Sequence, residues 1–226
     1  MKTIVYIAHE EITQSSSQQF LLQSGQALTN AIFVDLHAEW QKNGTFDTQV
    51  EQQRLMQYER ILFQFPLYWY QAPSILKQWM DTVFDTSKAL QMHLQRCQLG
   101  LVVVAGVKAS AYQAGGKEQR TLSELLSPYE ALARYFGMTY LPIFAIHQFQ
   151  YLTETEQMDL MMRYACYIET GTIDHFGTYQ QFLLEKLENT HLKLTEEQQL
   201  MWEFFVREIE QQQQELAELT SITQDW

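Results

Sequence analysis

Three consecutive serines, Ser15, Ser16 and Ser17, follow the first apolar run of the chain and precede a helical stretch. A serine at a helix start can cap the helix by accepting hydrogen bonds from free backbone amides, which is the simpler interpretation. Three hydroxyls beside the positive end of a helix dipole also suit a bound phosphate. His9, where the apolar run ends, is either an ordinary loop histidine or a donor to a phosphate oxygen. The residues alone leave both interpretations open.

A second unusual stretch, "FPLYWYQAPSILKQWMD" (65–81), places three aromatic residues between two prolines. Proline fixes φ and lacks a backbone donor, so the chain is irregular there. A segment that only filled a core would need no such loop. Trp69 lies within the loop and is a candidate to stack on a planar ligand. Trp79 lies on the apolar stripe of the following helix, so we expect it in the core.

These residues need a scaffold, and apolar runs of strand length recur along the first two thirds of the chain. They are rich in β-branched and aromatic residues and alternate little, which is typical of strands buried on both faces. The runs span residues 3–8, 31–36, 60–65, 99–105 and 139–146. This pattern predicts an α/β fold, a doubly wound five-stranded parallel sheet.

Helical stripes separate the strands. Residues 73–85 carry apolar residues at helical spacing, and so do residues 121–136, which Gly137 follows as a plausible C-cap. Residues 153–169 begin with Thr153 and Glu156, the spacing of a capping box. We therefore expect helices on both faces of the sheet.

The alternation stops after about residue 170. Residues 171–226 contain no run typical of a strand and are expected to form two helices, roughly 176–189 and 195–219, the second capped by Thr195. The polar stretch "EQQQQE" fits a solvated helix. We expect a domain over residues 1–170 and a C-terminal helical extension over residues 171–226.

The doubly wound topology brings the serines and the aromatic loop together. In such a sheet the carboxyl ends of the first, third and fourth strands open on one crevice, where ligands bind. The segment "AGVKASAYQAGG" (105–116) follows the fourth strand and joins the other two loops there. A phosphate site beside a platform for a flat ring suggests flavin mononucleotide (FMN), or a larger dinucleotide that uses the same half of the site.

Composition argues against several other classes of protein. The formal net charge of −12 argues against a nucleic-acid partner, which needs a basic surface. Cys97 and Cys166 lie far apart without metal-type spacing, so we expect neither a disulfide framework nor a bound metal. The apolar start lacks the pattern of a signal peptide, and no run has the length of a membrane span. We expect a cytoplasmic protein without membrane insertion.

Three blocks of the sequence resemble the flavodoxin-like NAD(P)H:quinone oxidoreductases, over about residues 1–170. The blocks are "AHEEITQSSSQQFLL", "FDTQVEQQRLMQYERILFQFPLYWYQAPSILKQWMDTVF" and "AYQAGGKEQRTLSELLSPYEALARYFGM". The most similar branch is the bacterial one that includes the ancillary proteins of glutathione-gated potassium efflux. The resemblance implies a flavodoxin-like strand order, 2-1-3-4-5, and a homodimer whose sites lie at the subunit junction.

The resemblance also implies roles for individual residues. The flavin phosphate and ribityl chain would be held by His9, Ser15, Ser17 and Gln18. The flavin ring would be lined by Pro66, Leu67, Tyr68, Trp69 and Tyr70, and approached by the backbone of Ala105, Gly106 and Val107. Tyr112 is the expected catalytic residue, a donor to the acceptor oxygen as negative charge develops there. Its alternative role is a loop tyrosine packed on the helix at residue 121.

The chain departs from the family pattern at three places. Many relatives carry Asn where this chain has Gln18. The usual Thr-Thr-Gly-Gly after the fourth strand is replaced by "VAGV" (104–107), and β-branched Val107 would resist a conformation with φ > 0. The histidine that some relatives place shortly after the tyrosine is not evident, because that stretch is occupied by Gly115, Gly116 and Lys117.

The resemblance implies an NAD(P)H-dependent flavin oxidoreductase with FMN, FAD being possible. A nicotinamide would donate hydride to flavin N5 and leave, and a quinone or similar flat electrophile would then take the hydride. A second hypothesis is a regulatory flavodoxin-like subunit that docks on a cation-efflux transporter with weak or no catalysis. The altered loop and the C-terminal extension favour this alternative slightly. An electron-transfer flavodoxin is a third hypothesis, but nothing in the sequence suggests its docking face.

Overall fold

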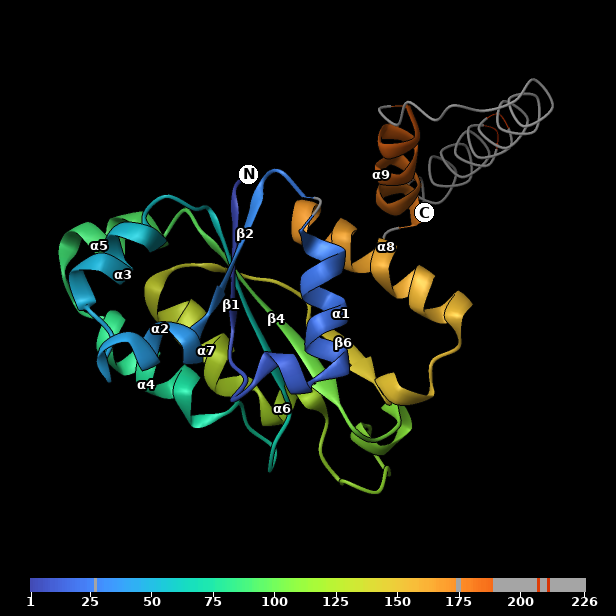
Figure 1. Ribbon diagram of the computed structural model, residues 1–226, viewed down its shortest axis with the longest axis horizontal. Coiled ribbons are helices and arrows are strands. Elements are labelled where there is room, and N and C mark those ends of the chain that lie inside the picture. The colour runs from blue at the N-terminus through green and yellow to red at the C-terminus, as the bar shows by residue number, and fades with distance from the viewer. Residues whose placement is uncertain (27, 174–175, 189–206, 208–210, 212–226) are drawn as a thin grey trace, which may run out of the picture. The chain divides into compact units, whose positions relative to one another are not determined.

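The computed structural model describes residues 1–26, 28–173, 176–188, 207 and 211. Residue contacts divide the chain into two compact units, Met1–Ile173 and Asp174–Trp226. In the first unit a parallel sheet carries helices on both faces (Figure 1). In the second unit residues 176–188 form α9 (Phe176–Glu188), where a helix was expected. Of the other expected helix, over 195–219, the structure describes residues 207 and 211, both helical, and the expected cap Thr195 lies outside the described residues.

The sheet has the strand order β2-β1-β3-β4-β5, with β6 also paired to β4. Every pair is parallel, and β1 and β3 are buried along their whole length. This confirms the flavodoxin-like order 2-1-3-4-5. The strands are β1 (Thr3–Ile7), β2 (Ala31–Asp35), β3 (Arg60–Pro66), β4 (Gln98–Ala105), β5 (Thr139–Tyr140) and β6 (Phe144–His147).

The run expected as one fifth strand, over residues 139–146, is two strands in the structure. β5 pairs with the start of β4, and β6 pairs with its end. Pro142 lies between them and lacks the N–H that a sheet ladder needs. Its carbonyl instead accepts a hydrogen bond from the hydroxyl of Tyr167, at 2.8 Å. The sheet is therefore six-stranded by element count, and the expectation of five was wrong in that detail.

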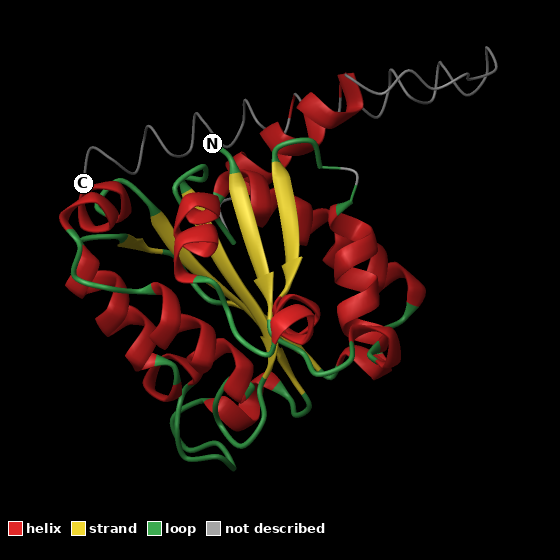
Figure 2. Cartoon of the chain, turned by 60° about the vertical axis from the view of Figure 1, so that its left-hand side comes forward, coloured by secondary structure: helices red, strands yellow, loops and turns green. Residues whose placement is uncertain are grey.

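Two layers of helices cover the sheet. Figure 1 shows one layer, α1 (Ser16–Gly25) with α8 (Glu154–Thr170), on one face, and the turned view of Figure 2 shows the sheet between the layers. The capping box of Thr153 and Glu156 and the left-handed C-cap at Gly137 are both present, as predicted. The opposite face is covered by α2 (Leu36–Asn43), α3 (Thr48–Leu55), α4 (Ser74–Val83), α5 (Lys88–Leu94) and α7 (Ser127–Phe136).

The segment expected as one helix, over residues 121–136, breaks at Leu126 into α6 (Leu122–Leu125) and α7. Pro128 cannot donate a backbone hydrogen bond to the carbonyl of Glu124, four residues earlier. The hydroxyl of Ser127 donates to that carbonyl instead, at 2.9 Å. The proline and the serine together therefore account for the break.

The core under α4 is built around Trp79, which is completely buried. Its ring centroid lies 4.2 Å from that of Tyr6 and 5.8 Å from that of Phe63. Its Nε1 donates to the carboxylate of Glu51 at 3.0 Å, so the buried indole N–H is paired. The prediction of Trp79 as a core residue is confirmed.

Candidate functional site

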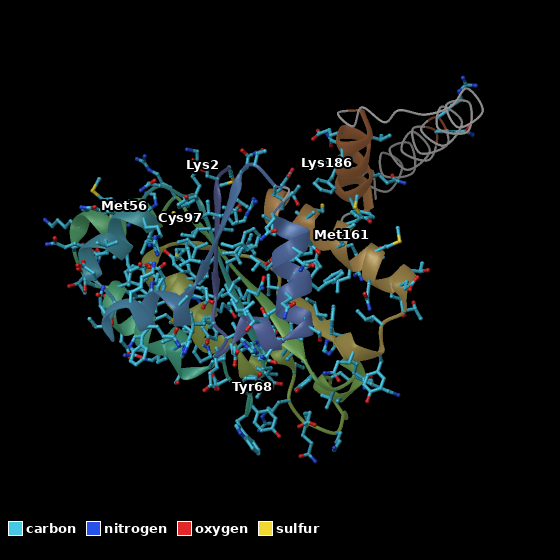
Figure 3. The ribbon with its side chains drawn as sticks, in the orientation of Figure 1. Lys2, Met56, Tyr68, Cys97, Met161 and Lys186 are labelled. Carbon is cyan, nitrogen blue, oxygen red and sulfur yellow. The ribbon has the colours of Figure 1, made fainter. Side chains whose placement is uncertain are left out.

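The carboxyl ends of the parallel strands open on one edge of the sheet. Figure 3 shows Tyr68 at this edge and Lys2 at the opposite one. A cavity of about 410 Å³ lies there, which we call the serine cavity. The three expected loops meet in its wall, together with the loop after β6. Its lining residues are His9, Gln14, Ser15, Ser16, Ser17, Pro66, Tyr68, Val104, Ala105, Gly106, Gln148, Phe149, Gln150 and Tyr151.

The serines form the wall at the start of α1. Ser15 caps the helix, because its Oγ accepts from the amide of Gln18 at 3.4 Å, and that Oγ lies 3.3 Å from the Oγ of Ser17. The capping interpretation is therefore confirmed. The amides of Ser16 and Ser17 belong to the first helical turn and have no acceptor within the helix. Capping thus leaves hydroxyls and amides able to face an anion.

His9 separates the serine cavity from the next cavity. Its Nδ1 accepts from the amide of Glu11 at 3.0 Å, so the proton of the neutral imidazole is assigned to Nε2. Nε2 lies 3.4 Å from the hydroxyl of Tyr68. His9 therefore presents an N–H donor at the wall that it shares with Tyr68.

The three aromatic residues after β3 form a tight turn. The amide of Tyr68 donates to the carbonyl of Gln71 at 2.9 Å, and the amide of Gln71 donates back at 3.0 Å. Trp69 and Tyr70 between them have φ of 49° and 67°, as in a type I′ turn, which normally uses Gly or Asn. We call residues 68–71 the aromatic turn. A left-handed conformation costs a bulky residue about 1–3 kcal/mol, and such strain clusters at functional sites.

The aromatic turn displays its tryptophan. The side chain of Trp69 is 92% exposed and lines a separate cavity beside α2 and α4. Tyr70 donates its hydroxyl to Glu118 Oε2 at 3.0 Å, and this carboxylate raises the pKa of Tyr70. Glu118 belongs to the loop after β4, so the two loops are joined at their tips. A large planar surface is thus held away from the core.

The loop after β4 carries Tyr112, at the end of a short 3₁₀ turn (Ala109–Tyr112). Partial burial is the main cause that raises the pKa of Tyr112 above its usual range. Its ring centroid lies 6.1 Å from that of His147. Val107 is not among the residues with positive φ, so the expected conflict between its β-branch and the backbone does not arise.

The predicted site residues fall into three groups in the structure, according to the cavity that they line. Those that line the serine cavity are His9, Ser15, Ser17, Pro66, Tyr68, Ala105 and Gly106. Trp69 lines the cavity beside it. Those found in neither wall are Gln18, Leu67, Tyr70, Val107 and Tyr112.

Gln18 points into the protein instead of into the serine cavity. It is completely buried, and its Oε1 accepts from Gln64 Nε2 at 2.7 Å. The hydroxyl of Tyr164 in turn donates to Gln64 Oε1. The Oε1 of Gln18 thus serves an internal network, while its buried Nε2 has no hydrogen-bond partner among the described residues. Its role in holding the flavin phosphate and ribityl chain stays a prediction.

Several lining residues were not predicted: Gln14, Val104 and the segment 148–151. Ser16, one of the three serines considered for a phosphate, also lines the cavity. Residues 148–151 follow β6 and begin with Gln148 in a left-handed conformation, φ 50°. The signal for them was available, because the fifth expected strand also ends at the carboxyl edge of the sheet.

A second cavity, of about 740 Å³, adjoins the first and shares His9, Gln14 and Tyr68 with it. It is lined by Glu10, Glu11 and Asp35, and we call it the acidic cavity. The serine cavity has no carboxylate among its lining residues. Its volume lies in the range of small-ligand sites, and its helix start and hydroxyls suit a phosphate. The residues of the serine cavity therefore fit FMN.

The sequence pattern of a protein family described as "flavodoxin-like fold" matches residues 1–167. The chain belongs to this family. A Bacillus subtilis relative named NAD(P)H oxidoreductase YrkL is 34% identical over 172 residues, which is 75% of this chain and 98% of the relative. The glutathione-regulated potassium-efflux ancillary protein KefG of Serratia proteamaculans is 32% identical over 143 residues, 62% of this chain and 78% of KefG. The suspected family is confirmed.

Solved structures agree. The NADPH-quinone reductase of P. pentosaceus has 41% sequence identity and a TM-score of 0.68, over 74% of this chain and 98% of that one. General stress protein 14 of Treponema denticola, solved with FMN, has 26% identity and a TM-score of 0.67, over 75% and 98% of the two chains. The matched region in each case corresponds in extent to the first unit of this chain.

Two absences hold for the described part of the chain. Its side chains include no group of His, Cys, Asp and Glu arranged to hold a metal ion. Among its helices, none combines the length and the apolar character that a membrane crossing requires.

Proposed function

We propose that this protein is an NAD(P)H-dependent flavin oxidoreductase that uses FMN to reduce quinones or similar flat electrophiles. One observation supports the proposal most. At the carboxyl edge of the sheet, the start of α1 lines a cavity that has no carboxylate in its wall, and the strained aromatic turn lies at the same edge. A relative solved with FMN supports the cofactor, and a relative named NADPH-quinone reductase supports the reaction. The flavin domain would span residues 1–170, and residues 171–226 would extend it.

The serine cavity would bind the phosphate end of FMN. The amides and hydroxyls of Ser16 and Ser17 and the Nε2–H of His9 are the donors available there. The aromatic turn and the backbone of residues 105–107 would line the ring. We favour FMN over FAD because the adjoining cavity carries Glu10, Glu11 and Asp35, which would repel a second phosphate. Bound FMN supplies hydride acceptance from a nicotinamide and hydride delivery to the acceptor.

Tyr112 would donate a hydrogen bond to the acceptor oxygen. Because its pKa is raised, its phenol remains neutral to a higher pH than a free tyrosine. We expect Tyr112→Phe to slow reoxidation by a quinone by about tenfold, the loss of one donor at a partly exposed site, and to leave reduction by NADPH unchanged. In the wild type, reoxidation should stay constant past the ordinary tyrosine pKa of about 10 and fall only at higher pH. Stopped-flow traces of both half-reactions check this, and equal slowing of both would contradict the assignment.

A homodimer and a cytoplasmic location complete the proposal, both on the strength of the family resemblance. The exposed aromatic turn is a surface on which a second copy could close the site. Sedimentation velocity of the purified protein would give the oligomeric state. A strictly monomeric protein with full activity would remove the dimer from the proposal.

The test of the proposed function is the visible spectrum of the purified protein. We expect the bands of oxidised flavin, FMN as the ligand released on denaturation, and bleaching on anaerobic addition of NADPH or NADH. Initial rates at varied donor and quinone should give parallel double-reciprocal lines, the pattern of two separate half-reactions. A colourless protein that takes up neither FMN nor FAD would overturn the proposal.

A second candidate is a regulatory subunit that docks on a cation-efflux transporter. The similarity to KefG and the replacement of the usual loop by "VAGV" favour it. It predicts slow or absent quinone reduction together with specific retention by the cytosolic domain of such a transporter. Efficient turnover without such retention would decide for the enzyme.

A further inference from the structure

His147 holds the loop after β4 from a neighbouring strand. It is the last residue of β6, in register with Ala105, the last residue of β4. Its Nδ1 lies 3.0 Å from the carbonyl oxygen of Val107. A carbonyl only accepts, so Nδ1 carries the proton and donates. The backbone of Gln148 adds one more bond, from its amide to the carbonyl of Ala105 at 2.8 Å.

The start of this loop, at Gly106 and Val107, has few other contacts. A Cβ added to Gly106 would meet no atom within 4 Å, so this side of the loop is open. Among the hydrogen bonds of the described residues, the one from His147 is the single bond to Val107. Gly106 of this loop lines the serine cavity together with Val104 and Ala105, the last residues of β4. The strand pairing holds Val104 and Ala105, whereas the position of Gly106 depends on the bond from the imidazole to the next residue, Val107.

His147 also supports Tyr112. The two ring centroids lie 6.1 Å apart at an interplanar angle of 40°. The sequence between Tyr112 and Thr121 contains no histidine, but β6 brings one to the tyrosine in space. One side chain thus contacts both Val107, which follows the lining residue Gly106, and Tyr112, the expected donor to the acceptor oxygen.

We propose that His147 is a positioning residue, which orients the cavity wall through its Nδ1–H and Tyr112 through its ring. The expected effects of His147 on flavin binding rest on the proposed function. Its effect on the loop itself requires no flavin. Two substitutions separate the two contacts: His147→Asn keeps a donor near the place of Nδ1, and His147→Phe keeps the ring without the donor.

The first test uses the flavin-free protein and trypsin. The loop carries Lys108, Lys117 and Arg120, all exposed, as cleavage sites. Losing one net hydrogen bond of about 1 kcal/mol should raise the open population, and so the rate of cleavage after Lys108, by about fivefold. We expect this increase in His147→Ala and His147→Phe, and a rate near the wild type in His147→Asn. Mass spectrometry of the fragments identifies the cut.

The second test measures FMN binding by fluorescence quenching. The dissociation constant should rise about fivefold in His147→Ala and His147→Phe, and less than about twofold in His147→Asn. The ring contact is tested by reoxidation with quinone, which His147→Asn should slow. Combining His147→Asn with Tyr112→Phe should then slow it little further, because both substitutions act through the same phenol.

His93 provides the matched control. Its Nε2 also lies 3.0 Å from a backbone carbonyl oxygen, that of Tyr58, but at the opposite edge of the sheet. His93→Ala should leave cleavage after Lys108 and FMN affinity unchanged. The proposal would be overturned by a His147→Phe protein with wild-type loop cleavage and affinity, or by equal effects of His93→Ala. If the wild type bound no FMN, the proposed function would fail while the cleavage test still decided the role of His147.

Discussion

The two edges of the sheet differ in which residue types adopt the left-handed backbone conformation. Among the described residues, the non-glycine positions with positive φ are Trp69, Tyr70, Gln119 and Gln148, all in loops at the carboxyl edge. Where a described helix ends in this conformation, its C-cap is a glycine. These C-caps are Gly44, Gly137 and Gly171. Among the described residues, this strain thus occurs at the carboxyl edge.

At the amino edge, by contrast, a buried charged side chain has hydrogen-bond partners. Arg60, at the start of β3, is only 1% exposed, yet its Nε donates to Gln98 at 2.8 Å and its Nη1 to the carbonyl of Ile168 at 2.6 Å. Each strained residue at the carboxyl edge costs about 1–3 kcal/mol. The strained residues lie at the carboxyl edge, where the cavities open. We infer that the amino edge contributes more to stability and the carboxyl edge more to ligand binding.

The largest effect should come from the amino edge. Arg60→Ala would leave the amide oxygen of Gln98 unpaired beside a new cavity, and the carbonyl of Ile168 would keep only its hydrogen bond from the hydroxyl of Thr3. The free energy of unfolding should therefore fall by about 3 kcal/mol. FMN affinity of the folded protein should change less than about twofold, because the serine cavity lies at the other edge. Urea unfolding and FMN titration at low temperature measure the two effects. Arg60→Met, which keeps most of the volume, should cost less.

At the carboxyl edge we expect a substitution to lower FMN affinity and leave the free energy of unfolding nearly unchanged. Ser17→Asp places a carboxylate in the serine cavity, where it would face a phosphate, and FMN affinity should fall by about 100-fold or more. Stability should hold, because an acidic residue in the first turn of α1 suits the helix dipole. Thr13→Asp on the same loop is the control, since Thr13 lines the acidic cavity. If both variants lost FMN equally, the contrast between the cavities would be wrong.

The regular parts of the fold followed from the sequence, because burial on both faces leaves few choices for apolar runs such as 60–65 and 99–105. The breaks came from Pro142 and Pro128, whose missing N–H groups were visible but whose effects depend on the partner strand and on Ser127. The inward turn of Gln18 could not be predicted, since it depends on Gln64 and Tyr164, far away in the sequence.

The conformation of the aromatic turn could not be predicted from local sequence preferences either. A type I′ turn selects Gly or Asn, so no propensity would place Trp69 and Tyr70 at positive φ. The family resemblance identified the segment, and the structure supplied the reason for its cost: the turn displays an exposed ring beside the serine cavity.

Trp69→Gly should separate stability from binding at this turn. Glycine adopts the left-handed conformation without penalty, so the free energy of unfolding should rise by about 1 kcal/mol. Loss of the stacking ring should weaken FMN affinity by about tenfold. Trp69→Ala removes the ring but keeps the strain, and should lose affinity without gaining stability. A Trp69→Gly protein that bound FMN as well as the wild type would show that the strain serves something else.

The smallest effect concerns the link between the two loop tips. The pKa of Tyr70 is raised first by its hydrogen bond to Glu118 and second by the negative charge of that carboxylate. Glu118→Gln keeps an acceptor for the hydroxyl but removes the charge. The pKa of Tyr70 should therefore move back toward its ordinary value, which a difference titration of near-ultraviolet absorbance against a Tyr70→Phe background would detect. FMN affinity should change less than about twofold, because an exposed charged contact contributes little. A larger loss of affinity would mean that the link between the loops, and not the strained turn alone, sets the position of the aromatic surface.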